Sequence, residues 1–427
     1  MTLDVARIRQ DFPILNREVH GGVPLVYLDS AATSQKPQMV IDAERDFYEV
    51  HNAAVHRGAH ALAEESTLAY EEARRDIAQF IGANPDEIVY VKNATEAINL
   101  VAYGFSNATA KSRMGNSLSE GEHRFVLEIG DEILLSEMEH HANLIPWQEV
   151  ALKTGAVLKF IPLTDDGRLD LSSLSSLVCD KTKVISVVHQ SNILGTINDL
   201  EPLRVAARSV NAWFVVDACQ SVPHMQMDVA TLGADFVAFS GHKMLGPLGI
   251  GVLWGSSQAL SSLPVFITGG SMIKTVHLAS STYADSPTKF EAGTPMAAQA
   301  VGLGAAARYL SEIGMDKIAQ HEHALTEKAV KALQEIPGLD IVGPNNSIDR
   351  GSAISFVIKD IHPHDVGQVL DSKGVAVRVG HHCAWPVCRR YGVPATTRAS
   401  FYLYNDESDI DALVAGIYSA QKFFGVA

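Results

Sequence analysis

Cysteine is scarce in this chain, which has four in 427 residues: Cys179, Cys219, Cys383 and Cys388. So few cysteines do not make the disulfide framework of a small secreted protein, and we expect free thiols in a reducing compartment. Long apolar runs are also absent, since lysines interrupt "ALKTGAVLKFIPL" before it is long enough to span a bilayer. The first residues, "MTLDVARIRQDFPIL", lack the apolar core of a signal peptide. We therefore expect a cytoplasmic protein without a membrane anchor.

Positive charge is also in short supply. The chain has 34 lysines and arginines against 49 acidic residues, a formal net charge of -15. A surface of this sign repels nucleic acid and anionic membranes, so we expect neither as a partner, although a small basic pocket for one anionic ligand is compatible with it. The length and the 47% hydrophobic content predict a globular chain with two domains, or a large domain with a smaller companion.

Short apolar runs alternate with helical patterns through the middle of the chain. Two of the helical patterns are "TEAINLVAYGF" (95–105) and "DLEPLRVAARSV" (199–210). Strands that are apolar throughout and separated by helices are typical of a mostly parallel sheet that is covered on both faces, so the predicted fold class is α/β. The predicted strands cover residues 86–91, 131–138, 157–163, 183–190, 213–219, 234–240 and 249–255.

The alternation of short apolar runs and helical patterns ends near residue 295. Two long helical runs precede the β-rich runs "ISFVI", "GVAVRVG" and "RASFYLY", and a helical pattern ends the chain. We predict a large domain over 25–295 and a smaller α+β domain over 1–24 and 296–427. The polar, aperiodic stretch "SNATAKSRMGNSLSEGEH" (106–123) is predicted to be an exposed loop.

An acid and a lysine follow two successive predicted strands. "FVVDACQS" ends the first with Asp217, and "FVAFSGHKMLGPLG" carries Lys243 just after the second. A surface salt bridge is the ordinary interpretation of such a pair. However, both residues belong to the carboxyl ends of strands, where open α/β sheets bind ligands. A desolvated lysine can form a Schiff base, and a carboxylate can keep a heterocyclic nitrogen protonated. Pyridoxal 5'-phosphate (PLP) needs both groups.

A phosphate would need its own donors. Thr95 lies at the start of a predicted helix, where free N–H groups and the helix dipole favour an anion, although a plain N-cap is an equally good interpretation. Ser240 and His242 offer further donors beside Lys243.

Two more strand ends carry polar side chains. "SEMEHHANLIPW" places His140 and His141 after one of them, where an imidazole can stack on a flat cofactor ring. Taken alone, each histidine is more often packed in a core or exposed. "HQSNILGT" places Asn192 after another strand, with its amide available to a cofactor or a substrate.

Nine stretches, in this order, carry a resemblance to a known family: "YLDSAAT", "AAVHRGAH", "TEAINLVA", "MEHHANLIPW", "SNILGT", "VVDACQS", "FSGHKMLGPLGIGVL", "FEAGTP" and "VRVGHHCAWP…TTRASFYLYN". From about residue 10 to its C-terminus the chain resembles group II (SufS-like) cysteine desulfurases and selenocysteine lyases. These are class V aminotransferases of the PLP-dependent fold type I (aspartate aminotransferase-like) superfamily. The resemblance implies a large domain with a mostly parallel central sheet flanked by helices, and a smaller α+β domain that carries the Cys383 loop.

The resemblance also implies roles for the residues that match family motifs. Lys243 would hold PLP covalently and shuttle protons, and Asp217 would pair with the pyridine nitrogen. His140 would stack on the ring, and Cys383 would be the catalytic cysteine. Further cofactor contacts would come from Gln220, Thr95, Ser240, His242 and, reaching the phosphate of the partner subunit in a homodimer, Thr294. Substrate contacts would come from Arg398, Asn192 and Arg378.

The implied reaction converts L-cysteine into L-alanine. Sulfur would pass to Cys383 as a persulfide and then to a small acceptor protein of iron–sulfur cluster assembly. Stretch 106–123 and segment 269–280, the latter predicted as a hairpin near the site, are candidates for docking that protein, although ordinary solvated loops are the alternative. Selenocysteine lyase and cysteine sulfinate desulfinase are rival activities on the same scaffold, and a catalytically silent scaffold is the non-enzyme alternative.

The chain departs from the family pattern in four places. Stretch 106–123 is longer than usual, and Ala94 replaces a hydroxyl residue that would add a phosphate contact. Cys219 occupies a place often held by a smaller residue, and Cys388 is not part of the catalytic pattern.

"GHHCAWPVC" permits other interpretations of Cys383 itself. Zinc sites usually draw spaced ligand pairs from two segments, and no second pair matches here, so we predict no metal. A disulfide to Cys388 is disfavoured in a reducing compartment, and a buried structural thiol is the ordinary role of a lone cysteine. The glycine and the two histidines before Cys383 favour an exposed thiol that ionises readily.

Overall fold

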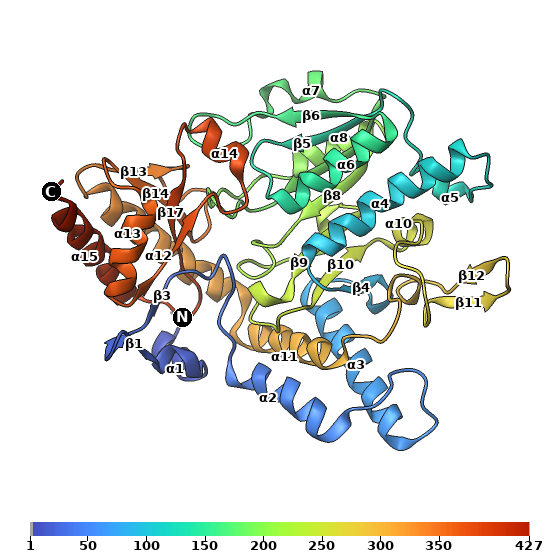
Figure 1. Ribbon diagram of the computed structural model, residues 1–427, viewed down its shortest axis with the longest axis horizontal. Coiled ribbons are helices and arrows are strands. Elements are labelled where there is room, and N and C mark those ends of the chain that lie inside the picture. The colour runs from blue at the N-terminus through green and yellow to red at the C-terminus, as the bar shows by residue number, and fades with distance from the viewer. Residues whose placement is uncertain (1–2, 427) are drawn as a thin grey trace.

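The computed structural model describes residues 3–426 and is built around a seven-stranded sheet (Figure 1). Its strands lie in the order β4-β10-β9-β8-β7-β5-β6, and those from β6 to β9 run parallel. β10 is antiparallel to both of its neighbours. The predicted mostly parallel sheet is confirmed, and each strand overlaps a predicted one. The strands are β4 (Ile88–Val91), β5 (Glu132–Ser136), β6 (Val157–Ile161), β7 (Thr182–Val188), β8 (Trp213–Asp217), β9 (Phe236–Ser240) and β10 (Gly251–Gly255).

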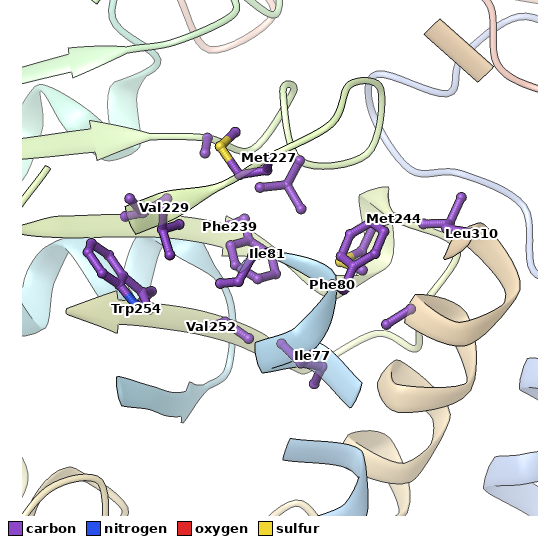
Figure 2. Packing of buried hydrophobic residues seen from close by; sticks show 14 of the residues in the cluster. Ile77, Phe80, Ile81, Met227, Val229, Phe239, Met244, Val252, Trp254 and Leu310 are labelled. Atoms are coloured by element: carbon purple, nitrogen blue, oxygen red, sulfur yellow. The ribbon is translucent and has the colours of Figure 1, made fainter. Parts of the chain in front are cut away.

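Helices cover both faces of this sheet. They are α2 (Gln38–Asp46), α3 (Ala61–Phe80), α4 (Ala94–Arg113), α6 (Ile145–Thr154), α8 (Glu201–Ser209), α10 (Ser257–Ser262) and α11 (Ala297–Ile313). Successive strand residues point to opposite faces. In β4, Ile88 joins the hydrophobic cluster of α3 and α11, whereas Val89 joins the cluster of α4, α6 and α10. Figure 2 shows the first cluster, in which Ile77 and Phe80 of α3 accompany Phe239 of β9.

A second, antiparallel sheet organises the C-terminal part of the chain. Its strands lie in the order β13-β14-β17-β16, and a separate hydrophobic cluster joins them to three helices. The predicted smaller sheet is thus present. These elements are β13 (Leu339–Val342), β14 (Ala353–Ile358), β16 (Arg378–Gly380), β17 (Thr396–Ser400), α12 (Met315–Gln334), α13 (Pro363–Ser372) and α15 (Glu407–Phe424).

The remaining elements are short. A parallel pair joins β3 to β15, so the N-terminal segment lies against the C-terminal part of the chain. Helix α11, which follows residue 295, packs on α2 and α3, two of the helices that cover the large sheet. The predicted boundaries after residues 24 and 295 stay predictions, and residues 1, 2 and 427 lie outside the described range. The short elements are α1 (Val5–Gln10), β1 (Glu18–Val19), β2 (Val23–Pro24), β3 (Val26–Tyr27), α5 (Glu120–His123), α7 (Leu174–Leu177), α9 (Val229–Leu232), β11 (Ile273–Val276), β12 (Ser281–Tyr283), β15 (Val375–Ala376) and α14 (Trp385–Arg390).

The prediction of a loop over 106–123 is correct only for residues 114–119, which are non-helical and mostly exposed. α4 continues to Arg113, and α5 forms where Ser119 and Glu122 make a capping box. Tertiary contacts hold the extension: the Thr109 hydroxyl accepts from the backbone N–H of Leu127 at 2.9 Å. The hairpin predicted over 269–280 is only partly confirmed: β11 lies within this segment, whereas its partner β12 lies wholly beyond residue 280. Its predicted place near the site stays a prediction. None of the helices within residues 3–426 is long and apolar enough to cross a membrane.

Candidate active site

The ends of four neighbouring parallel strands bring the predicted site residues to one rim of the large sheet. β8 ends at Asp217, and β9 ends just before the short turn that carries Lys243. β5 precedes His140, and β7 precedes Asn192. Because these strands are parallel and adjacent, their carboxyl ends meet at the same edge.

A cavity of about 200 Å³ lies at this rim. The small sheet contributes to it as well, because β17 and the loop after β16 reach the same space. The cavity contains every predicted site residue except Thr294, which is exposed and lines a different hollow. The predicted residues that line it are Thr95, His140, Asn192, Asp217, Gln220, Ser240, His242, Lys243, Arg378, Cys383 and Arg398.

Asp217 forms the floor of the cavity rather than part of a surface salt bridge. Its side chain is only 2% exposed, and it accepts from the backbone N–H of Cys219 at 3.0 Å. Burial raises the pKa of Asp217, while the Cys219 N–H and the nearby Lys243 oppose that rise. The surface-pair interpretation is therefore wrong. A buried carboxylate on this floor suits a protonated ring nitrogen.

Phosphate donors gather where α4 begins. Asn93 is the N-cap of this helix, since its side chain accepts from the Glu96 N–H at 3.0 Å, so the N-cap interpretation of Thr95 is wrong. Thr95 is exposed at the second position of the helix. The Ser240 hydroxyl lies beside it and accepts from the Ala94 N–H at 2.9 Å. The Nδ1 atom of His242 is buried and has no partner among the described residues.

His140 is held as a neutral ring. Burial lowers its pKa to about 3, and the nearby Lys243 adds to this. Its Nδ1 atom accepts from the Ala142 N–H at 3.0 Å, which fixes the ring at the start of a short turn. A neutral, fixed imidazole on the cavity wall suits stacking on a flat cofactor.

Arg398 marks the other end of the cavity. Its guanidinium is 1% exposed, donates to the Asn192 carbonyl at 2.9 Å and pairs with Asp29 at 3.0 Å. Its Nε atom and the Asn192 Oδ1 atom are buried without a partner in residues 3–426. Buried groups of this kind are normally satisfied by a ligand or by water. Together with the exposed Arg378, Arg398 provides a binding end for a carboxylate.

Cys383 stands at the cavity mouth as an exposed free thiol. Cys388 is also free but is buried in a hydrophobic cluster with Val188 and Leu194, so the disulfide alternative is wrong. The structural-thiol alternative fits Cys388 and not Cys383. Among residues 3–426, no group of three or more His, Cys, Asp or Glu side chains is placed to hold a metal ion.

Comparison with known proteins identifies the family. Residues 26–413 match the family model described as aminotransferase class-V. The chain belongs to this family. A probable cysteine desulfurase of Streptomyces coelicolor is 58% identical and covers 99% of this chain and 98% of its own. Apo cysteine desulfurase from Thermococcus onnurineus is 37% identical, with a TM-score of 0.90 over 99% of both chains. Cysteine desulfurase CsdA from Escherichia coli is 35% identical, with a TM-score of 0.86 over 99% of this chain and all of its own.

Membership of the class-V aminotransferase family confirms the predicted family, the fold type and the cofactor, PLP. The residues that line the cavity fit PLP. A lysine, a buried carboxylate and a neutral imidazole line one cavity with His242, whose Nδ1 atom has no partner in the described part of the chain. Lys243 would hold the cofactor's aldehyde carbon, Asp217 and Gln220 its ring, and Thr95, Ser240 and His242 its phosphate.

Sequence reasoning missed several groups in this class-V site. Asp29 belongs to the stretch "YLDSAAT", but it pairs with Arg398, which lies 369 residues further along the chain. Gln190 lines the cavity with a buried Oε1 atom that has no partner among residues 3–426. Lys36 donates to the carbonyl of His242 at 3.0 Å. The position of Asp29 after a short strand was the only sequence signal that could have found any of these roles.

Proposed function

We propose that this chain is a PLP-dependent cysteine desulfurase that converts L-cysteine into L-alanine. One observation carries the proposal: Lys243, Asp217, Arg398 and the exposed Cys383 all line one cavity. A lysine with a buried carboxylate suits PLP chemistry, and an exposed thiol at the mouth suits attack on sulfur. The names of relatives such as the one from Streptomyces coelicolor support the same activity.

The protein groups divide the work between the two ends of the cavity. Arg398 and Arg378 hold the substrate carboxylate, and Asn192 helps to orient the substrate. When bound, PLP would supply an electron sink for the charge left on the substrate when its α-proton is removed. Lys243 takes that proton and later returns one, while Asp217 keeps the floor of the cavity negatively charged.

Cys383 accepts the sulfur. Its thiolate attacks the sulfur atom of the bound cysteine, so a sulfur–sulfur bond forms as the carbon–sulfur bond breaks. The carbon skeleton is protonated and leaves as L-alanine, and a persulfide stays on Cys383. Because the thiol is exposed, a small acceptor protein can collect this sulfur. We propose that the acceptor serves iron–sulfur cluster assembly and that both proteins act in the cytoplasm.

Alanine formation tests the activity. Cofactor-loaded wild type should release alanine from cysteine and should gain one sulfur atom on the Cys383 peptide in mass spectrometry. Cys383→Ser should lose both signals and keep its cofactor absorbance, whereas Cys388→Ser should keep all three. A wild-type protein that binds PLP without forming alanine would favour a silent scaffold.

The same variants separate the rival activities. Cleavage of selenocysteine or cysteine sulfinate does not need the nucleophilic thiol, so Cys383→Ser should retain these reactions while losing cysteine desulfuration. If wild type turns over selenocysteine or sulfinate but not cysteine, the desulfurase proposal is wrong. Equal loss on all substrates in Cys383→Ser would contradict the stated role of the thiol.

We propose a homodimer in which Thr294 completes the phosphate site of the partner subunit. Two observations support it: Thr294 is exposed and lies apart from the cavity of its own chain, and the adjacent Gly293 N–H donates to the Gly270 carbonyl at 3.0 Å, just before the exposed hairpin β11–β12. Thr294→Ala should weaken PLP binding. Mixing it with Lys243→Ala should restore part of the activity, because one mixed site then contains both native residues. No recovery in a verified mixed dimer would exclude this arrangement.

A further inference from the structure

The turn that carries Cys383 has a backbone conformation that needs support. His382 and Cys383 have φ values of 51° and 56° in succession. Few residues other than glycine adopt this left-handed region, and side chains held there cost free energy that the surroundings must repay. The position of the reactive thiol is therefore set by whatever holds this turn.

Two residues from segments that follow strands of the large sheet hold it. The Asn192 side-chain amide donates to the carbonyl of His382 at 2.6 Å. The backbone N–H of His141 donates to the carbonyl of Cys383 at 2.7 Å, and the Nε2 atom of His141 accepts from the N–H of Trp385 at 3.1 Å. His141 thus binds the residues on both sides of Ala384, from a position directly after the ring-stacking His140.

The side-chain bond of His141 satisfies a helix end. Trp385 is the first residue of α14, and the first N–H groups of a helix have no partner within it. To accept this bond, the imidazole must be neutral with its proton on Nδ1. Burial lowers the pKa of His141, and the nearby His381 adds to this, so the neutral form is favoured. The Trp385 ring packs against the His381 ring at a tilt of 38°, with 4.4 Å between the ring centroids.

We propose that His141 is a positioning residue that clips the Cys383 turn to the end of β5. The clip fixes the thiol relative to His140 and hence to the cofactor ring. His141 does not line the cavity, so it contacts neither the substrate carboxylate nor the phosphate site. The inference rests on the proposed role of Cys383, and it assigns His141 to the sulfur-transfer step and not to substrate binding.

Two substitutions separate the side-chain acceptor from ring size. His141→Phe keeps a ring and the backbone N–H but loses the acceptor for Trp385, whereas His141→Gln keeps a side-chain acceptor. We expect kcat for alanine formation to fall about 10- to 100-fold in His141→Phe, because misplacing a reacting group by about 1 Å has that effect. KM for cysteine and the absorbance change on adding cysteine should stay as in wild type. His141→Gln should recover at least part of kcat.

Amide hydrogen exchange gives a second test, which does not depend on kinetics. In the cofactor-loaded wild type, the N–H of Trp385 should exchange slowly although its indole is 46% exposed. Rapid exchange there would overturn the clip. Trp385→Phe, which keeps the backbone donor, is the matched control and should keep kcat within about twofold and the same exchange rate.

Three kinetic results also contradict the proposal: an unchanged kcat in His141→Phe, an equal loss in the Phe and Gln variants, or a rise in KM with kcat preserved. Failure of the proposed function looks different. If Cys383→Ser still forms alanine, the thiol is not the sulfur acceptor, whatever His141 does. If Cys383→Ser is inactive while His141→Phe is fully active, only the clip is wrong.

Discussion

At the level of single residues, the four cysteines differ in what surrounds their sulfur atoms. Cys383 and Cys179 are exposed, whereas Cys219 and Cys388 are buried. Burial raises the pKa of the Cys219 thiol to about 12, with Asp217 contributing, and burial also raises that of Cys388. A protonated, enclosed thiol does not compete as a nucleophile. This explains how a site can tolerate a second cysteine beside its cofactor.

Alkylation should show this difference. Brief treatment of the folded protein with iodoacetamide near pH 7.5 should modify Cys383 and Cys179 and leave Cys219 and Cys388 unmodified. Peptide mass spectrometry measures each position, and all four should react in urea. Labelling of Cys219 as fast as that of Cys383 would contradict the buried, protonated state described here.

Lys36 gives a second prediction at this scale. Burial lowers the pKa of its amine to about 8, and it donates to the carbonyl of His242, next to Lys243. The ammonium is disfavoured in the fold relative to the unfolded chain, so stability should rise as the pH increases from 8 toward 10.5. Between pH 7 and 9 this single group should add about 1 kcal/mol to the free energy of unfolding.

Urea denaturation of wild type and Lys36→Gln at both pH values measures that contribution. The variant should lack the added stability, so the gap between the two proteins should shift by about 1 kcal/mol in favour of wild type at pH 9. Lys317→Gln, at a position that makes no ion pair among the described residues, serves as the control. Parallel pH dependence in wild type and Lys36→Gln would show that the amine is well solvated.

At the level of elements, the sequence predicted the strands of the large sheet better than the ends of its helices. Apolar runs bounded by turn residues located every strand of this sheet. A strand that is buried on both faces needs apolar side chains at nearly every position, so its sequence is a nearly continuous apolar run. The extension of α4 to Arg113 was not predicted from the sequence. Its residues are polar or small and show no helical periodicity, because tertiary contacts stabilise this part of the helix. The S-x-x-E spacing from Ser119 to Glu122 is the sequence signal for α5.

The same contrast applies to the site. Residues that directly follow strands, such as Asp217 and Lys243, were predictable because topology brings parallel strand ends together. The roles of Asp29 and His141 were not, because each depends on a partner in the small sheet or in the Cys383 loop. Spacing along the chain carries no information about such contacts.

A buried ion pair joins α3 to the segment before α11. Glu291 pairs with Arg74 at 2.7 Å and also accepts from the Tyr70 hydroxyl and the Tyr90 N–H. Glu291→Gln places an NH₂ group against these donors and leaves the Arg74 charge with only Glu71. We expect a loss of about 3 kcal/mol in the free energy of unfolding, which is typical of breaking a buried pair.

Urea denaturation measures the loss. Glu201→Gln removes one member of an exposed pair with Arg204 and should change stability little, because water screens that pair. If Glu291→Gln costs no more than Glu201→Gln, the α3 pair does not hold the elements together.

At the level of the whole molecule, the site lies where the two sheets meet. Arg398 of β17 reaches the end of β7 through Asn192, and the Cys383 loop reaches the end of β5 through His141. Helix α14 lies between the small sheet and the large one (Figure 1). Relative displacement of the two parts would therefore separate the thiol from Lys243, so activity requires the whole fold.

The protein as a whole should be sensitive to acid, because several of its histidines are held neutral inside it. Burial lowers the pKa of His189 and of His242 to about 4, and that of His140 to about 3. In the unfolded chain these groups take up protons near pH 6.5. Stability should therefore be complete above that pH and be lost as the pH falls toward 4.

The contribution of His189 to the loss of stability in acid can be measured separately, because His189 does not line the cavity and only burial shifts its pKa. Between pH 7.5 and 5 it should account for about 2 kcal/mol of the loss in the free energy of unfolding. In His189→Gln, which cannot be protonated, that drop should be smaller by this amount in urea denaturation at the two pH values. His123→Gln, at an exposed position, should follow wild type. If His189→Gln loses as much stability in acid as wild type, protonation of the buried imidazole does not limit the fold.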